Sequence, residues 1–174
     1  MINLELKHFC PDFDKVRKVL RELGAKKETI KTQKDYFFGL PAEKSSVSGR
    51  LKLRVEGKKQ KLVYYERPDF SAASGAASSL GLYDVEDDKL LPFLKRALGV
   101  AAIVEKKREV WRKANTVFHL DTVKGAGNIF EVELQKKGTI SEKDRKMFKS
   151  YQDKLLPVLG DVIKGSNIDL VLKK

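Results

Sequence analysis

Residues 49–56 have the sequence GRLKLRVE, in which basic and aliphatic side chains alternate without interruption. Successive side chains of a β-strand point to opposite faces, so this stretch predicts a strand with one charged and one apolar face. The basic positions are Arg50, Lys52 and Arg54, and the aliphatic ones are Leu51, Leu53 and Val55. The apolar face requires a cover of helices or a second sheet, whereas the charged face can line a polar interior.

The same alternation recurs later in the chain, now with acidic side chains. Residues 118–121 have the sequence FHLD and residues 129–134 the sequence IFEVEL, so acids occupy one face of each stretch. Basic and acidic stripes that recur in one small protein favour a charged interior, such as a barrel that holds a highly charged ligand. The other interpretation is that each stripe is the wet face of an ordinary antiparallel sheet.

The charged positions that fall in phase on the predicted strands can be collected into one set. The basic members are Lys7, Arg50, Lys52, Arg54, Arg67, Lys106 and Arg108, and the acidic members are Glu5, Asp121, Glu131 and Glu133. If these side chains line one cavity, the basic groups outnumber the acidic groups by three. A fully ionised triphosphate carries about four negative charges, so this set suits a triphosphate with Mg²⁺ or Mn²⁺ held by the acids.

Length and composition narrow the class of protein. The 174 residues predict one domain, without a spanning segment or a signal peptide, and therefore a cytoplasmic protein without membrane contact. The single cysteine, Cys10, excludes an internal disulfide. The net charge of +12 indicates a polyanionic partner. Nucleic acid fits this charge but is not favoured, because many of the cations are scattered along predicted helices.

Apolar periodicity and turn residues predict an α+β fold with the order β-α-β-β-β-β-α-β-β-β-α. Residues 68–79, rich in Ala and Ser, predict a loop. The strands are expected at 2–9, 35–39, 50–56, 61–67, 80–85, 102–113, 116–123 and around 131–133. The helices are expected at 12–24, from Asp87 or Asp88 to Leu98, and from a capping box at Ser141 to about Leu156. This order indicates an antiparallel sheet that is closed or nearly closed.

Several motifs, in a fixed order along the chain, resemble those of a known family. They are Asn3-Leu4-Glu5-Leu6-Lys7 at the position of a Glu-x-Glu-x-Lys signature, 49–54, 62–69, 104–109, 119–127, Phe130-Glu131-Val132-Glu133 and 165–170. The chain is similar to CYTH-domain proteins of the triphosphate tunnel metalloenzyme superfamily, and most similar to their class IV adenylyl cyclase branch. The resemblance implies one CYTH-like domain over 1–174, built as an eight-stranded antiparallel β-barrel tunnel with helices packed outside.

The resemblance also implies roles for individual residues. Glu5, Glu131, Glu133 and Asn3 correspond to metal ligands for Mg²⁺ or Mn²⁺, and Asp121 and Lys7 to catalytic groups. Arg50, Lys52, Arg54, Arg67, Lys106 and Arg108 correspond to phosphate-binding groups. We interpret His8 and His119 as packing or surface residues. The expected partner is a nucleoside triphosphate or another triphosphate, and the cyclase branch makes a homodimer a reasonable expectation.

Two functions follow from this resemblance. The first is a metal-dependent enzyme that either cyclises ATP to cAMP and pyrophosphate or hydrolyses a terminal phosphate. The second is a module that binds polyphosphate or nucleotide with little or no catalysis. The second function is kept because Asn3 replaces a signature glutamate, and an amide oxygen brings no charge to a metal.

Overall fold

The fold is described here from a computed structural model, in which residues 2–41, 49–66 and 76–172 are defined. Eight strands and several helices follow the predicted order, with a 3₁₀ turn and a short helix added at the end. The strands are β1 (Ile2–Phe9), β2 (Lys26–Phe38), β3 (Arg50–Glu56), β4 (Lys59–Glu66), β5 (Ala76–Val85), β6 (Val100–Lys113), β7 (Thr116–Val123) and β8 (Gly127–Lys136). The helices are α1 (Phe13–Glu22), α3 (Leu90–Leu98), α4 (Glu142–Leu155), η1 (Leu156–Val158) and α5 (Asn167–Leu172).

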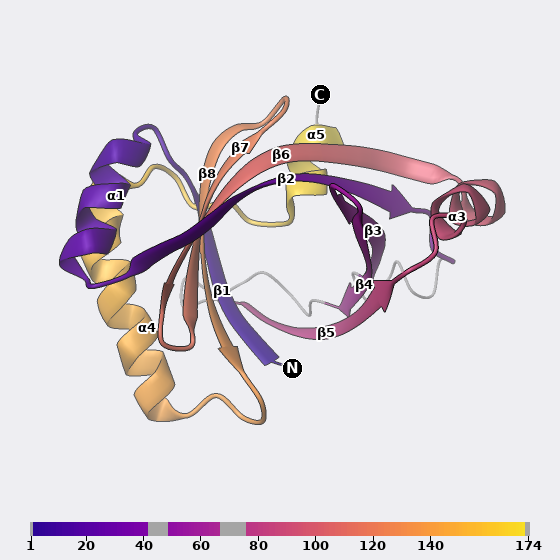
Figure 1. Ribbon diagram of the computed structural model, residues 1–174. Coiled ribbons are helices and arrows are strands. Elements are labelled where there is room, and N and C mark those ends of the chain that lie inside the picture. Colours follow the sequence, from indigo (N-terminus) through magenta and orange to yellow (C-terminus); the bar gives the residue numbers. More distant parts are fainter. Residues whose placement is uncertain (1, 42–48, 67–75, 173–174) are drawn as a thin grey trace.

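All the strand pairs are antiparallel, in the order β1-β5-β4-β3-β2-β6-β7-β8. Strand β1 pairs with β8 along its whole length and with β5 at residues 2–5, so the first and last strands of this order are hydrogen-bonded to each other. Beyond residue 5, residues 160–163 replace β5 as the neighbour of β1, with backbone hydrogen bonds to Lys7 and Phe9. Figure 1 shows the resulting strongly curved sheet, whose concave side faces the interior.

Helices cover the apolar outer face of this sheet in two places. Helices α1 and α4 lie together over β1, β7 and β8, where Phe130 and Val132 join one large apolar cluster (Figure 1). Helix α3 lies at the opposite side of the view, and its Leu94 packs with Leu53 of β3, with Leu51 beside them. The apolar faces of these strands are thus covered by helices, one of the two covers expected from the alternation at 49–56. The charged alternate positions of the same strands consequently face inward.

Helix α1 is fixed against the sheet by local signals and by one ion-pair cluster. The side chain of Asp12 accepts hydrogen bonds from the first turn of backbone N–H groups, as expected of an N-cap. At the surface of the sheet, Arg17 donates two hydrogen bonds to Glu109, at 3.1 and 3.0 Å. The indole of Trp111 donates a third to the same carboxylate at 2.6 Å. Although burial opposes it, this bonding lowers the pKa of Glu109 to about 2.

The structure also differs from the sequence-based expectations. Strand β2 begins at Lys26 rather than at Asp35. Its polar first part pairs with β6, but it lacks the apolar alternation from which a strand is predicted. Residues 76–79 belong to β5 rather than to a loop, since backbone pairing with β1 and β4 needs no particular side chains; residues 67–75 lie outside the described part.

Helix ends and the C-terminal segment add smaller corrections. The Asp87 side chain binds the backbone N–H of Lys89, but Lys89 itself is the N-cap of α3. The capping box at Ser141 is confirmed, with Asp144 as its reciprocal partner. Helix α5 was not predicted. Within the described residues, no helix is both long and apolar enough to cross a membrane.

Candidate functional site

The charged faces of the strands surround one cavity of about 630 Å³ inside the curved sheet. This volume is within the usual range of small-molecule sites, about 300–1,000 Å³. Eight of the residues predicted for the site line it: Glu5, Lys7, Lys52, Arg54, Lys106, Arg108, Glu131 and Glu133. The charged stripes therefore share one interior and are not separate wet faces.

On one wall of the cavity, two cations from β3 hold an acid from β2. The guanidinium of Arg54 donates hydrogen bonds to both oxygens of Asp35, at 2.7 and 2.8 Å, and Lys52 Nζ lies 2.8 Å from Oδ2. Burial opposes ionisation of Asp35, but the charges of Lys52 and Arg54 hold its pKa well below the usual range. Burial and the neighbouring Arg54 charge lower the pKa of Lys52 to about 7. Of the two cations bound to Asp35, Lys52 is therefore the one that titrates near neutral pH.

Beside this group, β6, which pairs with β2, supplies two more cations, and β7 supplies their acid. The guanidinium of Arg108 donates to both oxygens of Asp121, at 2.7 and 2.6 Å, and Lys106 Nζ lies 3.3 Å from the same carboxylate. Burial is the main cause that lowers the pKa of Lys106 to about 8. Asp121 is fully buried and is not among the residues that line the cavity. Its direct contact is with the two cations, so its geometry suits orienting Arg108 and Lys106.

Glu131 of β8 connects the basic groups with an acidic group. Its carboxylate accepts a hydrogen bond from Arg108 at 2.7 Å and pairs with Lys7 of β1 at 3.1 Å. Burial favours the neutral acid, but the charges of Lys7 and Arg108 keep the pKa of Glu131 well below its usual range. Glu131 is thus a carboxylate at neutral pH, already held by two cations.

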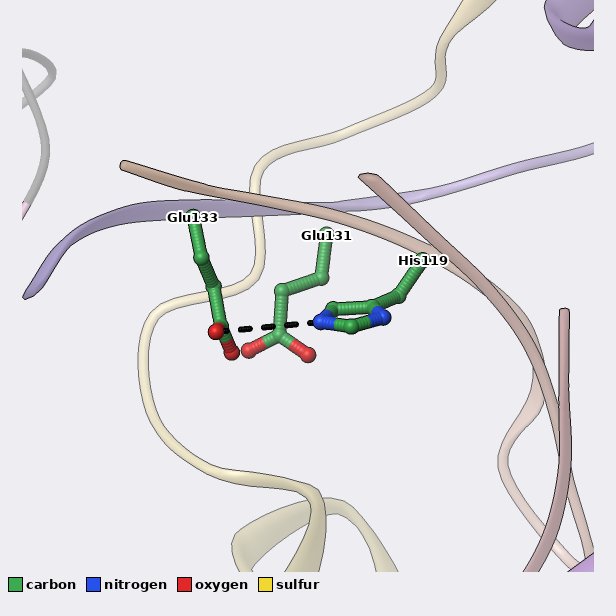
Figure 2. Close-up of side chains that lie close together, drawn as sticks. All are labelled: His119, Glu131 and Glu133. Carbon is green, nitrogen blue, oxygen red and sulfur yellow. Dashed lines mark ion pairs between the residues drawn. The ribbon is translucent and has the colours of Figure 1, made fainter. Parts of the chain in front are cut away.

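Three potential metal ligands meet next to this point. His119 of β7, Glu131 and Glu133 each offer an atom, and these atoms lie within 4.8 Å of one another. Figure 2 shows the two carboxylates and the imidazole directed toward one another, with the 3.7 Å contact from His119 Nε2 to Glu133 drawn as a dashed line. Burial and the Glu131 charge oppose ionisation of Glu133, yet its contact with His119 and the charge of Arg108 lower its pKa to about 2. The group is therefore anionic.

This group fits a divalent cation chemically. Two buried carboxylates supply the hard oxygen ligands that Mg²⁺ and Mn²⁺ prefer, and an imidazole nitrogen is a further ligand that Mn²⁺ accepts. Glu5 also lines the cavity and lies opposite Glu133 in the β1–β8 register. Residue Asn3 lies on the same strand, opposite Gln135, but its side chain is outside what the structure describes.

Two predicted phosphate-binding residues are not brought into the cavity by the described part of the chain. Arg50 is absent from the lining, and its guanidinium binds Asp169 of α5 at 3.4 Å. Arg67 lies outside the described residues, so its role stays a prediction.

The charges of the inner ion-pair network balance among the residues that the structure describes. Five cations (Lys7, Lys52, Arg54, Lys106 and Arg108) face five acids (Glu5, Asp35, Asp121, Glu131 and Glu133). The expected surplus of three positive charges is not found in this set, because Arg50 points elsewhere, Arg67 lies outside the described residues and Asp35 adds an acid. A bound polyanion would consequently need either metal cations or displacement of acids from their partners.

Sequence reasoning missed Asp35 and gave His119 only a packing role. Asp35 begins a run of aromatic residues, which concealed that it alternates with Gln33 and Phe37 on the cavity side. That alternation was the available signal. His119, interpreted as a packing or surface residue, is buried, and its pairing opposite Glu131 places it beside two acids.

Comparison with known proteins identifies the family. The sequence profile of the CYTH domain family matches residues 1–160, and the chain belongs to this family. A Methanocaldococcus jannaschii protein, whose name describes it as a candidate adenylate cyclase, is 27% identical over 179 residues, covering 100% of this chain and 95% of its own length.

Solved structures share the fold. The PH1012 protein from Pyrococcus horikoshii superposes with a TM-score of 0.78 at 22% identity, covering 97% of this chain and 98% of its own. HpAC1 from Hippeastrum, described as a candidate adenylyl cyclase with a dominant triphosphatase activity, gives a TM-score of 0.65 at 16% identity, covering 99% and 95%. At these identities the likeness concerns the fold.

Proposed function

We propose that this protein is a divalent-metal-dependent enzyme that acts on a triphosphate-bearing substrate, with the curved sheet serving as a tunnel around the phosphates. The observation that carries the proposal is the cavity itself, where phosphate-binding cations and a carboxylate–imidazole group share one buried space. The names of the relatives, a candidate cyclase and a cyclase-like triphosphatase, support the same substrate class.

Lys52 and Arg54 of β3, with Lys106 and Arg108 of β6, would hold the phosphate oxygens. Arginine forks bind phosphate oxygens in pairs, and lysines act as compact point charges. In the ligand-free protein the same cations are paired with Asp35 and Asp121, which hold them in position. Preorganised charge of this kind stabilises charge that develops on a transferring phosphoryl group.

His119, Glu131 and Glu133 would hold Mg²⁺ or Mn²⁺, with Glu5 and, by resemblance, Asn3 as further ligands. A bound divalent cation supplies charge neutralisation and orients phosphate oxygens. A fully ionised triphosphate carries about four negative charges, so two divalent cations would leave the balanced cavity neutral overall. Lys7 stays the proposed catalytic cation, and Asp121 is proposed to act by positioning Arg108 and Lys106.

The reaction is proposed as one of two. In cyclisation of ATP, the ribose 3′-hydroxyl attacks the α-phosphorus and pyrophosphate leaves. In hydrolysis, water attacks the terminal phosphorus. The second candidate function, a triphosphate-binding module with weak or no turnover, is favoured by one observation: Asn3 stands where the family signature has an acid.

Product analysis with Mg²⁺ or Mn²⁺ tests these proposals directly. The purified protein is incubated with ATP, thiamine triphosphate and inorganic triphosphate, and cAMP, pyrophosphate and orthophosphate are quantified. We expect turnover of at least one substrate, loss of at least tenfold on Lys52→Ala, and no change on Lys18→Ala, an exposed helix cation. Tight binding without any product would establish the binding module, whereas neither binding nor product would refute the proposed function.

A further inference from the structure

The C-terminal segment that follows the family match forms part of the cavity wall. The match ends at residue 160, yet Ser166 and Asn167 both line the cavity. Residues 160–163 run along the end of β1, with backbone bonds to Lys7 and Phe9 at 2.8–2.9 Å. The chain then enters α5, which packs against β6. This end of the cavity is therefore built by residues that lie beyond the matched range.

Asp169 holds this segment in a defined position. Its carboxylate accepts hydrogen bonds from the Ser166 backbone at 2.7 Å and hydroxyl at 3.0 Å, and from Arg50 of β3 at 3.4 Å. Gly165 has a φ of +116°, and a Cβ there would lie 2.9 Å from the Asp169 carboxylate. The wall formed by Ser166 and Asn167 is thus rigidly tied to β3, which explains why Arg50 is turned away from the cavity.

Asn167 brings an unsatisfied acceptor to this wall. Asn167 is only 8% exposed, and its Oδ1 has no hydrogen-bond partner among the described residues. An unpaired buried acceptor costs about 1–3 kcal/mol, which a ligand with an N–H or O–H donor would recover. Fully ionised phosphate groups offer acceptors only. A ligand group with an N–H or O–H donor, such as those of a nucleoside, would satisfy this acceptor.

Aromatic side chains lie at the same end. Phe37 shares an apolar cluster with Ile168, the neighbour of Asn167, and Tyr65 lies opposite Arg50 in the β3–β4 register. Both rings line the cavity and flank the amino group of Lys52, whose Nζ lies 5.3 and 5.8 Å from their centroids. Aromatic rings are the usual stacking partners of nucleobases, and here they adjoin a proposed phosphate cation.

We propose that Phe37, Tyr65 and Asn167 form a subsite for the nucleoside of a nucleoside triphosphate. The aromatic side chains contact the base, Asn167 Oδ1 accepts a hydrogen bond from its amino group or from a ribose hydroxyl, and the phosphates extend past Lys52. This inference rests on the proposed function and narrows it, because inorganic triphosphate leaves the subsite unused. The C-terminal segment is accordingly a determinant of substrate choice.

Binding of two matched probes tests the subsite. The probes are the ATP analogue and the inorganic triphosphate analogue in which methylene groups replace both bridging oxygens, so that neither is turned over. Each is titrated by calorimetry with Mg²⁺ present. We expect Asn167→Leu to lower affinity for the ATP analogue about three- to tenfold, as for one lost hydrogen bond, with the inorganic analogue unchanged. Tyr65→Leu should act on the same probe, whereas Tyr65→Phe, which keeps the ring, should not.

Two controls separate the possible failures. Lys52→Ala should weaken both probes at least tenfold, since it removes a charge-assisted phosphate contact. If the wild-type protein binds both probes and Lys52→Ala weakens both, but Asn167→Leu and Tyr65→Leu do not discriminate between them, the subsite is refuted and the proposed function stands. If the wild-type protein binds neither probe, the proposed function fails and the subsite fails with it. The melting temperature of Asn167→Leu should not fall, because the substitution removes an unpaired acceptor.

Discussion

Replacing Asp35 by asparagine should destabilise the protein and at the same time tighten triphosphate binding. The substitution keeps the shape of the side chain but removes its charge. Asp35 accepts three charge-assisted hydrogen bonds of 2.7–2.8 Å from Lys52 and Arg54, and it is 2% exposed. Breaking a buried pair by removing one partner costs about 3–5 kcal/mol, because an uncompensated charge stays behind. We therefore expect Asp35→Asn to lower the free energy of unfolding by this amount.

The effect on the ligand should have the opposite sign. In the free protein, phosphate oxygens compete with Asp35 for the two cations. Releasing even one charge-assisted hydrogen bond, worth about 1.5 kcal/mol, should raise affinity for triphosphate about tenfold. The cavity also loses one negative charge, which favours a polyanion further.

Urea unfolding of the ligand-free protein and calorimetric titration with inorganic triphosphate measure the two effects. Glu105→Gln is the matched control, because it removes the same charge from a carboxylate that is 42% exposed and paired with surface lysines. The control should change stability far less than Asp35→Asn and leave binding unaffected. If Asp35→Asn weakens triphosphate binding while the control does not, Asp35 supports the ligand instead of competing with it, and the reasoning is refuted.

Three further predictions concern acid stability, proton uptake and metal affinity. Because the pKa of Glu109 is lowered to about 2, its contribution to stability is complete above its ordinary pKa of 4.5 and is lost as the pH falls toward 2. The urea midpoint of Glu109→Gln should therefore decline less between pH 4.5 and pH 2 than that of the wild type. At pH 8, Lys52, with a pKa of about 7, is mostly uncharged, so triphosphate binding should be coupled to the uptake of about one proton. This uptake is measured as a dependence of the binding heat on the ionisation enthalpy of the buffer, and Lys52→Arg should reduce it. Asn3→Glu should lower the Mn²⁺ concentration for half-saturation about tenfold and Glu133→Gln should raise it, as measured by Mn²⁺ titration of the ligand-free protein; an unchanged Asn3→Glu would place residue 3 outside the metal site.

Many features of the strands could be predicted from the sequence, because they depend on neighbouring residues. The period-two alternation at 50–56 placed Lys52 and Arg54 on the face opposite Leu53, and the structure shows that arrangement. The same period failed for the first part of β2 and for residues 76–79, where polar or small side chains carry no alternation. Backbone pairing holds those segments in the sheet, and it leaves little trace in the side chains.

The ion-pair partners of the charged residues could not be predicted from the local sequence pattern. Asp35 joins Lys52 and Arg54 only because β2 and β3 pair in one register, and a shift by one residue would place Asp35 on the outer face. His119 meets Glu131 through the register of β7 and β8. Sequence patterns identify which side chains point inward, but register decides which of them touch.

The sequence by itself therefore determined the α+β class, the inward face of each strand with clear alternation, and the presence of basic and acidic groups suited to a triphosphate. Only the tertiary structure decided which buried charges pair with one another, that Arg50 binds Asp169, and that Asn167 lines the cavity. The physical reason is distance along the chain. Side-chain direction follows from local backbone geometry, whereas the pairing of a charge depends on residues that are brought close only when the sheet curves and its ends meet.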